Sequence, residues 1–584
     1  MKLHIYPLAL LLCLLILPAT LAAAPEAEYK KLSRTYTLHA DGSQEYRYAM
    51  ELTLYTHTAM NRTYGETFVV YNPQYQELKI NEARVVQKDG TVITTPDNAF
   101  VEVLPSQAAN APEYNHLKEM VIVHTGLELG ATIYLDYSIV TKPGYLPNLD
   151  ICEAVWQTSP VTDYTLTIQT PENKPLAYNL YNLKDKPSVS TTNGVRTVTW
   201  KIKNMPASSR APQVTAMGGD VPLLTATTYP AAADALTALK GQLSSPDAAM
   251  RERASTITTD SITQQEKLTK ILDYVVDLVG NSGLSLQETG YKLRPAQQVI
   301  ESAYGTRAEK ANLLACLLNC TGIQADIVAS YPVLADASCG LSAVSELLVC
   351  TNVDGKAYLL SPTQKSMAAA GWHTAYASLL SVSDPGKAVA IKIPATGLEY
   401  KVATTLCKEK ASNQIAATAG DAFLPYSGSA AARFAAGDKE ATEEKADGYT
   451  TFTYSQNQSL KATGDYILWT LPDSPESLSH AAYSRYNSKR TENLLLNYAA
   501  SEQYKYEITL PEGMTLHTPL AVKSIDNKAG RLMISVRRIG ETIEVIRTLE
   551  IDHTLIKPSE YADFRTLMTE WADVNGRTLL FKVE

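Results

Sequence analysis

Cysteine and histidine are the scarce chemistry-bearing residues of this 584-residue chain, with seven and nine copies. Four cysteines, Cys316, Cys320, Cys339 and Cys350, share the middle of the chain with a single histidine, His373. A thiol beside an imidazole can act as a nucleophile, because the imidazolium favours the thiolate. The positions of these residues therefore decide whether a cysteine nucleophile is available.

The spacing of these residues favours structural roles over catalysis. Cys316 and Cys320 lie four residues apart on an apolar helical face, which is typical of core residues. Cys339 and Cys350 are either free or bridged, since an exported protein permits disulfides. A dyad of either thiol with His373 would have no supporting motif, and a solvent-facing loop histidine is the simpler interpretation.

Other common chemistries have no motif in the chain. It contains no phosphate-binding loop, no His-Glu-x-x-His, no Gly-x-Ser-x-Gly and no Cys-x-x-Cys pair for zinc. The formal net charge of -9 argues against binding to nucleic acid. We therefore expect no metal, no cofactor and no nucleic-acid partner.

Residues 1–24 have the pattern of a secretory signal peptide. Lys2 and His4 form a short polar start, Ile5 to Leu17 an apolar core, and Ala19 to Ala24 a small-residue cleavage region. A membrane anchor is the alternative, but the apolar run is shorter than the ~20 residues that a span needs. We expect an exported protein, periplasmic or extracellular, with no transmembrane segment after cleavage.

Hydrophobic periodicity divides the remaining chain into three regions, so we predict a multidomain α+β protein. Period-two runs separated by turns predict an N-terminal antiparallel β-sandwich over residues 25–229 and a C-terminal β-rich domain over 393–584. A weak echo links these two regions, since Tyr164 to Glu172 and Tyr506 to Glu512 are each a strand closed by Pro-Glu. Convergent turn chemistry and a duplicated sandwich both explain the echo.

The region between them, residues 230–392, mixes helix and strand. Thr263, three residues before Glu266, predicts a capping box for a helix over 264–279, and Ser245-Pro246 predicts the start of a shorter helix. A further helix is predicted over 307–319. Strands are predicted over 347–353 and 357–360, joined by an Asp-Gly turn.

This middle region resembles the core of the transglutaminase-like superfamily. The run Tyr304 to Leu318, followed by Gly322 to Ala325, is similar to the family's Gly-x-Cys-x-Asp-Lys-Ala helix start and its Gly-Ile turn. Glu346 to Val349 and Asp354 to Thr363 resemble the family's His strand and Asp-Pro-Thr strand. The flanks resemble a secreted bacterial architecture, with an N-terminal β domain of unknown function and a second β domain after the core. The resemblance implies a papain-like α+β domain over 230–392.

The three catalytic identities of that family are absent. Where the family has Cys, His and Asp, this chain has Arg307, Glu346 and Ser361. Arginine is neither a nucleophile nor able to lose its proton, so the resemblance implies a degenerate triad. A cation at a helix start is unfavourable against the helix dipole, and Arg307 therefore invites an anionic partner. One hypothesis is an ion pair with Glu346 within ~4 Å, and the other is two ordinary surface charges.

We therefore expect a secreted, catalytically inactive transglutaminase-like protein that binds a peptide, a glycan or an envelope protein, or acts as a scaffold. The alternative is a cysteine peptidase or transglutaminase-like enzyme with a displaced nucleophile, and a purely structural spacer is a third possibility. Tyrosine outnumbers phenylalanine 34 to 7. Because amphipathic rings suit recognition surfaces, exposed rings clustered around Arg307 would support the binding interpretation.

Overall fold

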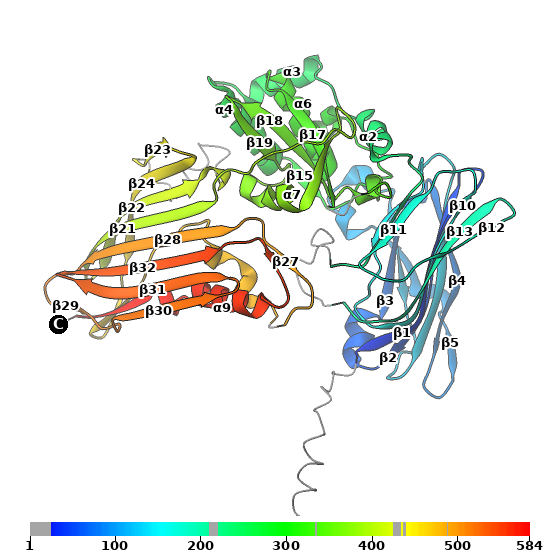
Figure 1. Cartoon of the computed structure of the whole chain (residues 1–584), viewed down its shortest axis with the longest axis horizontal. Helices are drawn as coiled ribbons and strands as arrows, with labels where there is room; N and C mark the ends of the chain where they lie inside the picture. The colour runs from blue at the N-terminus through cyan, green and yellow to red at the C-terminus, as the bar shows by residue number, and fades with distance from the viewer. Residues whose placement is uncertain are drawn as a thin grey trace, which may run out of the picture.

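The computed structural model describes residues 25–208, 220–332, 336–423, 434–435, 438, 440–487 and 489–583. The expected signal segment, residues 1–24, lies outside these described residues. The chain is multidomain and strand-rich, with a separate large hydrophobic core in each of three parts. Figure 1 shows a mixed helix-and-strand domain lying across two β-rich domains. Among the described helices, none is both long and apolar enough to cross a membrane.

The N-terminal domain is built on an eight-stranded sheet. In order across the sheet, its strands are β12 (Ser188–Thr192), β13 (Val195–Met205), β10 (Val161–Pro171), β1 (Ala27–Leu38), β2 (Gln44–Leu54), β8 (Thr132–Thr141), β4 (Gln76–Val86) and β5 (Val92–Thr94). The predicted antiparallel sheet is wrong at one place, because β1 pairs with β10 in parallel. Period-two alternation shows which face of a strand is buried and does not show the direction of its neighbour.

Two three-stranded sheets accompany this large sheet. They consist of β11 (Ala177–Tyr181), β14 (Leu223–Thr227) and β9 (Asp150–Ala154), and of β3 (Glu66–Tyr71), β7 (Lys118–Val123) and β6 (Phe100–Val103). Short helical turns, η3 (Ser106–Ala108) and η4 (Pro112–Tyr114), follow β6. These turns contact the central domain, where Tyr114 and Leu117 pack with Leu284 and Tyr304.

The central domain is a four-stranded antiparallel sheet with helices. The strands, in order, are β19 (Lys356–Leu360), β18 (Glu346–Val353), β17 (Ala325–Pro332) and β20 (Ala377–Ser381). The helices are α2 (Ala232–Lys240), α3 (Ala248–Ile257), α4 (Gln264–Asp273), α5 (Ala296–Ser302), α6 (Arg307–Cys320) and α7 (Gly371–Tyr376). Helix α6 is buried along most of its length and contacts both β17 and β18.

Two helix starts in this domain can be compared with their predictions. The capping box of Thr263 and Glu266 is confirmed, and α4 continues into a π-helical turn, η6 (Tyr274–Leu278). The cap predicted at Ser245 is wrong. Asp247 caps α3, and its carboxylate accepts the N–H of Met250 at 2.8 Å.

The C-terminal domain repeats the sheet plan of the N-terminal one. Its eight strands, in order, are β23 (Thr442–Ala446), β24 (Tyr449–Ser459), β22 (Lys410–Gly420), β21 (Gly397–Cys407), β28 (Ala500–Thr509), β32 (Thr542–Ile551), β31 (Gly530–Ile539) and β30 (Ala521–Asn527). Behind them lie the sheet of β25 (Ala462–Thr463), β26 (Tyr466–Thr470), β34 (Thr578–Val583) and β29 (Met514–Leu516), and helix α9 (Tyr561–Ala572). The two short strands β27 (Leu494–Leu495) and β33 (Leu555–Ile556) pair with each other.

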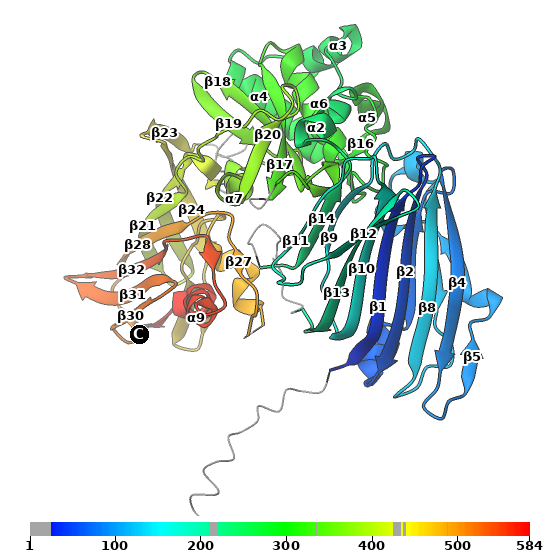
Figure 2. The same cartoon turned by 45° about the vertical axis from the view of Figure 1, so that its right-hand side comes forward.

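The two large sheets share the arrangement around their first strand, β1 or β21, which can be followed in Figures 1 and 2. In each, the first strand pairs antiparallel with the second and parallel with a later one, β10 or β28. The echoed segments Tyr164 to Glu172 and Tyr506 to Glu512 lie in, or begin in, these equivalent strands. This shared position favours duplication of a sandwich over convergence.

Candidate functional site

The start of helix α6 holds the first of the three predicted site residues. Thr306 is the N-cap, and its hydroxyl accepts the N–H of Glu309 at 3.2 Å while the Glu309 carboxylate accepts the N–H of Thr306 at 2.8 Å. This reciprocal capping box fixes where the helix begins. Arg307 is consequently the first helical residue, and its side chain is exposed.

The carboxylate that serves this helix start is Glu309. It is fully buried and receives two hydrogen bonds from the Arg294 guanidinium, at 2.9 and 3.0 Å. Tyr114 of the N-terminal domain donates to the same carboxylate at 2.5 Å. Burial, with Glu309 beside it, raises the pKa of Tyr114, so this phenol is a permanent donor. The N-terminal domain thus helps to hold the helix start in place.

Glu346 and Ser361 come together, as the resemblance implies. Glu346 is the first residue of β18, and Ser361 directly follows β19, its antiparallel neighbour. The Ser361 hydroxyl donates to the Glu346 carboxylate at 3.4 Å. The Glu346 side chain is 14% exposed, and together with Arg307 it lines a cavity of about 370 Å³.

The predicted ion pair between Arg307 and Glu346 is not formed. No contact within 4.0 Å joins the two described side chains, although they border the same cavity. The physical reason is that the Arg307 and Glu346 side chains each have surroundings other than each other. Glu309 supplies the anion at the helix start, Arg307 extends toward solvent, and the Glu346 carboxylate contacts His373 at 3.1 Å.

His373 is the residue whose role the sequence interpretation missed. It was expected in a solvent-facing loop, but it lies in α7 and is 1% exposed. Its Nδ1 is 2.6 Å from the hydroxyl of Ser330, and its Nε2 is 3.1 Å from Glu346. Ser330 lies in β17 and is fully buried. The apolar run before His373, Met367 to Ala370, was the one local signal of its burial.

The cysteines of the middle region offer no activated thiol. Cys316 is buried as predicted, and burial raises the pKa of its thiol to about 12, with Cys320 half-buried beside it. Burial likewise raises the pKa of Cys339 and of Cys350, and both thiols are free. A raised pKa disfavours the thiolate, which is the reactive form. The His373 ring contacts Ser330 and Glu346 at its two nitrogens, so it forms no dyad with a thiol through them.

The aromatic clustering that would support binding is not found in the described lining of this cavity. The described residues that line it are Gly283 to Leu286, Arg307, Ala308 and Val344 to Leu347, and none of them is aromatic. Tyrosines gather instead around a cavity in the N-terminal domain. Within the described ranges, no group of three or more His, Cys, Asp or Glu side chains is placed to hold a metal ion.

The geometry defines what the Arg307–Glu346 cavity can do. Its volume is near the lower end of the range of small-ligand sites, about 300–1,000 Å³. Arg307 can donate to an anion at one part of the wall, and Glu346, held by His373 and Ser361, can accept from a cation at another. The cavity therefore suits a ligand that carries both charges.

Comparison with known proteins finds two domain families and a solved structure that are similar to this chain. A domain of unknown function, DUF3857, matches residues 40–209, and another, DUF3858, matches residues 466–581. The crystal structure of a protein from Parabacteroides distasonis, described as a putative protease, is 38% identical, covers 96% of this chain over 99% of its own, and has a TM-score of 0.77. No curated protein matches the chain.

Proposed function

The chain belongs to the same family as the Parabacteroides distasonis protein described as a putative protease, and from this premise we propose that residues 230–392 form a transglutaminase-like domain that has lost its catalytic triad. In this proposal the protein is exported and acts as a non-catalytic binding module of the bacterial envelope. One observation carries it. Arg307 and Glu346 share a cavity with Glu346 anchored by His373, whereas the thiols of the domain are buried or half-buried and unactivated.

A peptide is the ligand that the cavity suits best. Peptides carry carboxylates for Arg307 and ammonium groups for Glu346, and backbone groups that hydrogen-bond to both. A neutral glycan would cover the same two charges without neutralising either, and an uncompensated charge is costly to desolvate. The charge pattern of the wall therefore favours peptide over glycan.

Retention on an immobilised library of random octapeptides tests this function. We expect the wild-type protein to be retained, and Glu346→Gln to bind roughly tenfold more weakly, because a hydrogen bond to a charged group contributes about 1.5–3 kcal/mol. Arg307→Ala should bind more weakly as well. The matched controls are Arg538→Ala and Glu541→Gln, which change exposed charges at the connection between β31 and β32 in the C-terminal domain. Equal retention of site variants and controls would contradict the proposal.

A peptidase is the second candidate, favoured by the description of the relative and by the contact chain Ser330–His373–Glu346. Ser330 is fully buried, and the ring faces it through Nδ1 rather than the Nε2 used in the usual triad. Hydrolysis of fluorescent casein distinguishes the two candidates. Activity lost in Ser330→Ala, or on alkylation with iodoacetamide, would favour a peptidase with a displaced nucleophile.

A further inference from the structure

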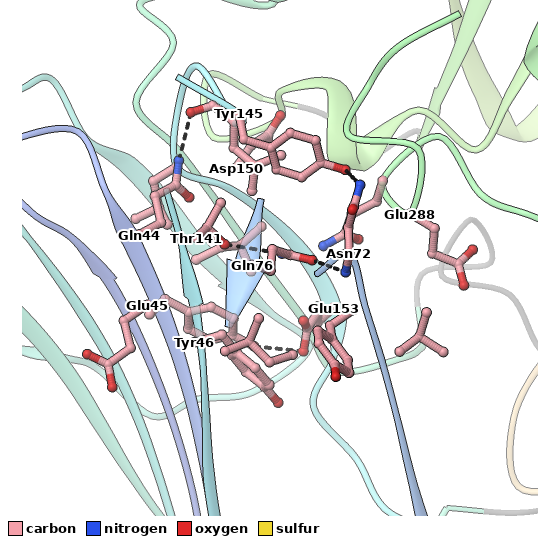
Figure 3. Close-up of a pocket in the computed structure, with 18 of the residues that line it drawn as sticks. Gln44, Glu45, Tyr46, Asn72, Gln76, Thr141, Tyr145, Asp150, Glu153 and Glu288 are labelled. Carbon is pink, nitrogen blue, oxygen red and sulfur yellow. Dashed lines mark hydrogen bonds between the residues drawn. The ribbon is translucent and has the colours of Figure 1, made fainter. Parts of the chain in front are cut away.

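A second cavity, of about 270 Å³, lies in the N-terminal domain where it meets the central domain. Strands β1, β2 and β8 of the large sheet border it, β3 and β9 form its sides, and Gln287 and Glu288 of the central domain also line it. Figure 3 shows Tyr46 and Tyr145 on opposite sides of this cavity. Two more tyrosines, Tyr36 and Tyr71, complete the aromatic part of the lining.

The charged side chains of the lining all have the same sign. They are Glu45, Asp150, Glu153 and Glu288, and the described lining includes no lysine, arginine or histidine. Arg34 pairs with Glu153 at 2.9 Å, and the His39 ring lies 3.9 Å from Glu45. Asp150 and Glu288 accept hydrogen bonds from the neutral groups of Ser342 and Ser285. Burial raises the pKa of Asp150 to about 6, which reflects the cost of an anion at this place.

Three side-chain amides of the lining, those of Gln44, Asn72 and Gln76, donate an N–H to the protein itself, as the dashed lines of Figure 3 indicate. The acceptors are the backbone oxygen of Leu146 for Gln44 at 3.2 Å, the Tyr145 hydroxyl for Asn72 at 3.2 Å and the Thr141 hydroxyl for Gln76 at 3.1 Å. The charged groups of the lining are all carboxylates, which accept hydrogen bonds when ionised. They favour a ligand that brings hydrogen-bond donors and a positive charge.

We propose that this cavity binds an organic ammonium ion, with its positive charge near the carboxylates and its hydrocarbon part against the tyrosine rings. The rings attract a cation through their negative faces, and the apolar side chains Val70, Leu117 and Ile139 accept the hydrocarbon. The inference goes beyond peptide binding at Arg307. It concerns a different cavity, made by different strands.

The test compares two probes of the same length. We expect 1,5-diaminopentane to bind the full-length protein saturably in calorimetry at millimolar concentration and to raise its unfolding temperature, and 1,5-pentanediol to do neither. Binding of both probes alike, or of neither, would overturn the proposal. Because the peptide site is a different cavity, Arg307→Ala should leave diamine binding unchanged. The diamine result can therefore fail or succeed independently of the peptide site.

Variants at the rim locate the binding. Glu45 and Glu288 are half-buried, so Glu45→Gln combined with Glu288→Gln removes two charges without opening the core. We expect the dissociation constant for the diamine to rise roughly threefold to tenfold in this double variant. Glu541→Gln, whose side chain is 96% exposed in the C-terminal domain, should have no effect. An unchanged dissociation constant in the double variant would place the diamine elsewhere and overturn the assignment.

Discussion

Buried carboxylates in this protein differ in the partners that stabilise them. Glu309 meets the guanidinium of Arg294, whereas the buried Glu502 accepts from three neutral groups. These are the Ser477 hydroxyl at 2.8 Å, the Leu478 N–H at 2.7 Å and the Tyr504 hydroxyl at 3.1 Å. Without a cation to offset desolvation, burial raises the pKa of Glu502 to about 7.

The raised pKa of Glu502 makes the stability of the fold depend on pH. The folded protein keeps the Glu502 proton that the unfolded chain releases near its ordinary pKa of 4.5, so the contribution of this group to stability falls as the pH rises from about 4.5 to about 7. Glu502→Gln removes that loss. We expect the variant to gain stability relative to wild type as the pH rises. In urea titrations, the difference between their unfolding free energies should shift in favour of the variant by up to roughly 3 kcal/mol between pH 4 and pH 8. A relative value equal at both pH values, as expected for Glu541→Gln, would contradict this account.

At the scale of residues, the resemblance singled out Arg307, Glu346 and Ser361 and missed their neighbour His373. Glu346 and Ser361 do contact each other, and Arg307 borders the cavity that Glu346 lines. The contact between Ser330 and His373 joins residues 43 apart in the chain. No local pattern encodes such a contact, so the pairing of His373 with Ser330 could not be deduced from spacing.

At the scale of elements, the start of helix α3 shows which of two candidate residues, Ser245 or Asp247, is the cap. Asp247 accepts a helix N–H, and the side chain of Ser245 has no such contact among the described residues. We expect Asp247→Ala to lower the unfolding free energy by about 1 kcal/mol, the usual cost of losing an N-cap, and Ser245→Ala to change it by less than half as much. Chemical denaturation of both variants checks this. A larger loss from Ser245→Ala would restore the cap predicted from the sequence.

Elements were predicted better than their pairing. The capping box at Thr263, the helix from Arg307 and the hairpin of β18 and β19 follow from short-range signals, and the structure has all three. The parallel pairs β1–β10 and β21–β28 do not follow from short-range signals, because the direction of a neighbouring strand depends on the path of the whole chain. Only the echo between β10 and β28 pointed to a repeated plan.

At the scale of the whole molecule, polar contacts connect the N-terminal and central domains at several places. Tyr114 donates to Glu309, and Asp150 accepts the Ser342 hydroxyl at 2.6 Å and its N–H at 3.1 Å. Asn179 donates to Asp336 at 2.9 Å. Because the contacts of Tyr114 with Glu309 and of Asp150 with Ser342 involve buried or half-buried groups, the two domains are expected to unfold together.

Removal of the Tyr114 hydroxyl tests that coupling. Tyr114→Phe leaves the buried Glu309 one donor short, at a cost of about 1–3 kcal/mol, and weakens the domain contact. We expect differential scanning calorimetry to show a lower or divided transition for this variant. Tyr55→Phe, which alters an exposed ring of the same domain, is the control. A single unshifted transition in Tyr114→Phe would show that the contact does not couple the domains.

The parallel pair of β1 and β10 also bears on how the chain folds. One edge of β1 (residues 27–38) pairs with β2, the next strand in the chain. Its other edge pairs with β10 (residues 161–171), which is far away in the sequence. The same separation recurs between β21 and β28. Such distant pairing raises the contact order, and high contact order slows folding. During synthesis from the N-terminus, one edge of β1 stays unpaired until more than a hundred further residues, up to β10, have been made. We therefore expect refolding of each β domain to be slow and prone to aggregation.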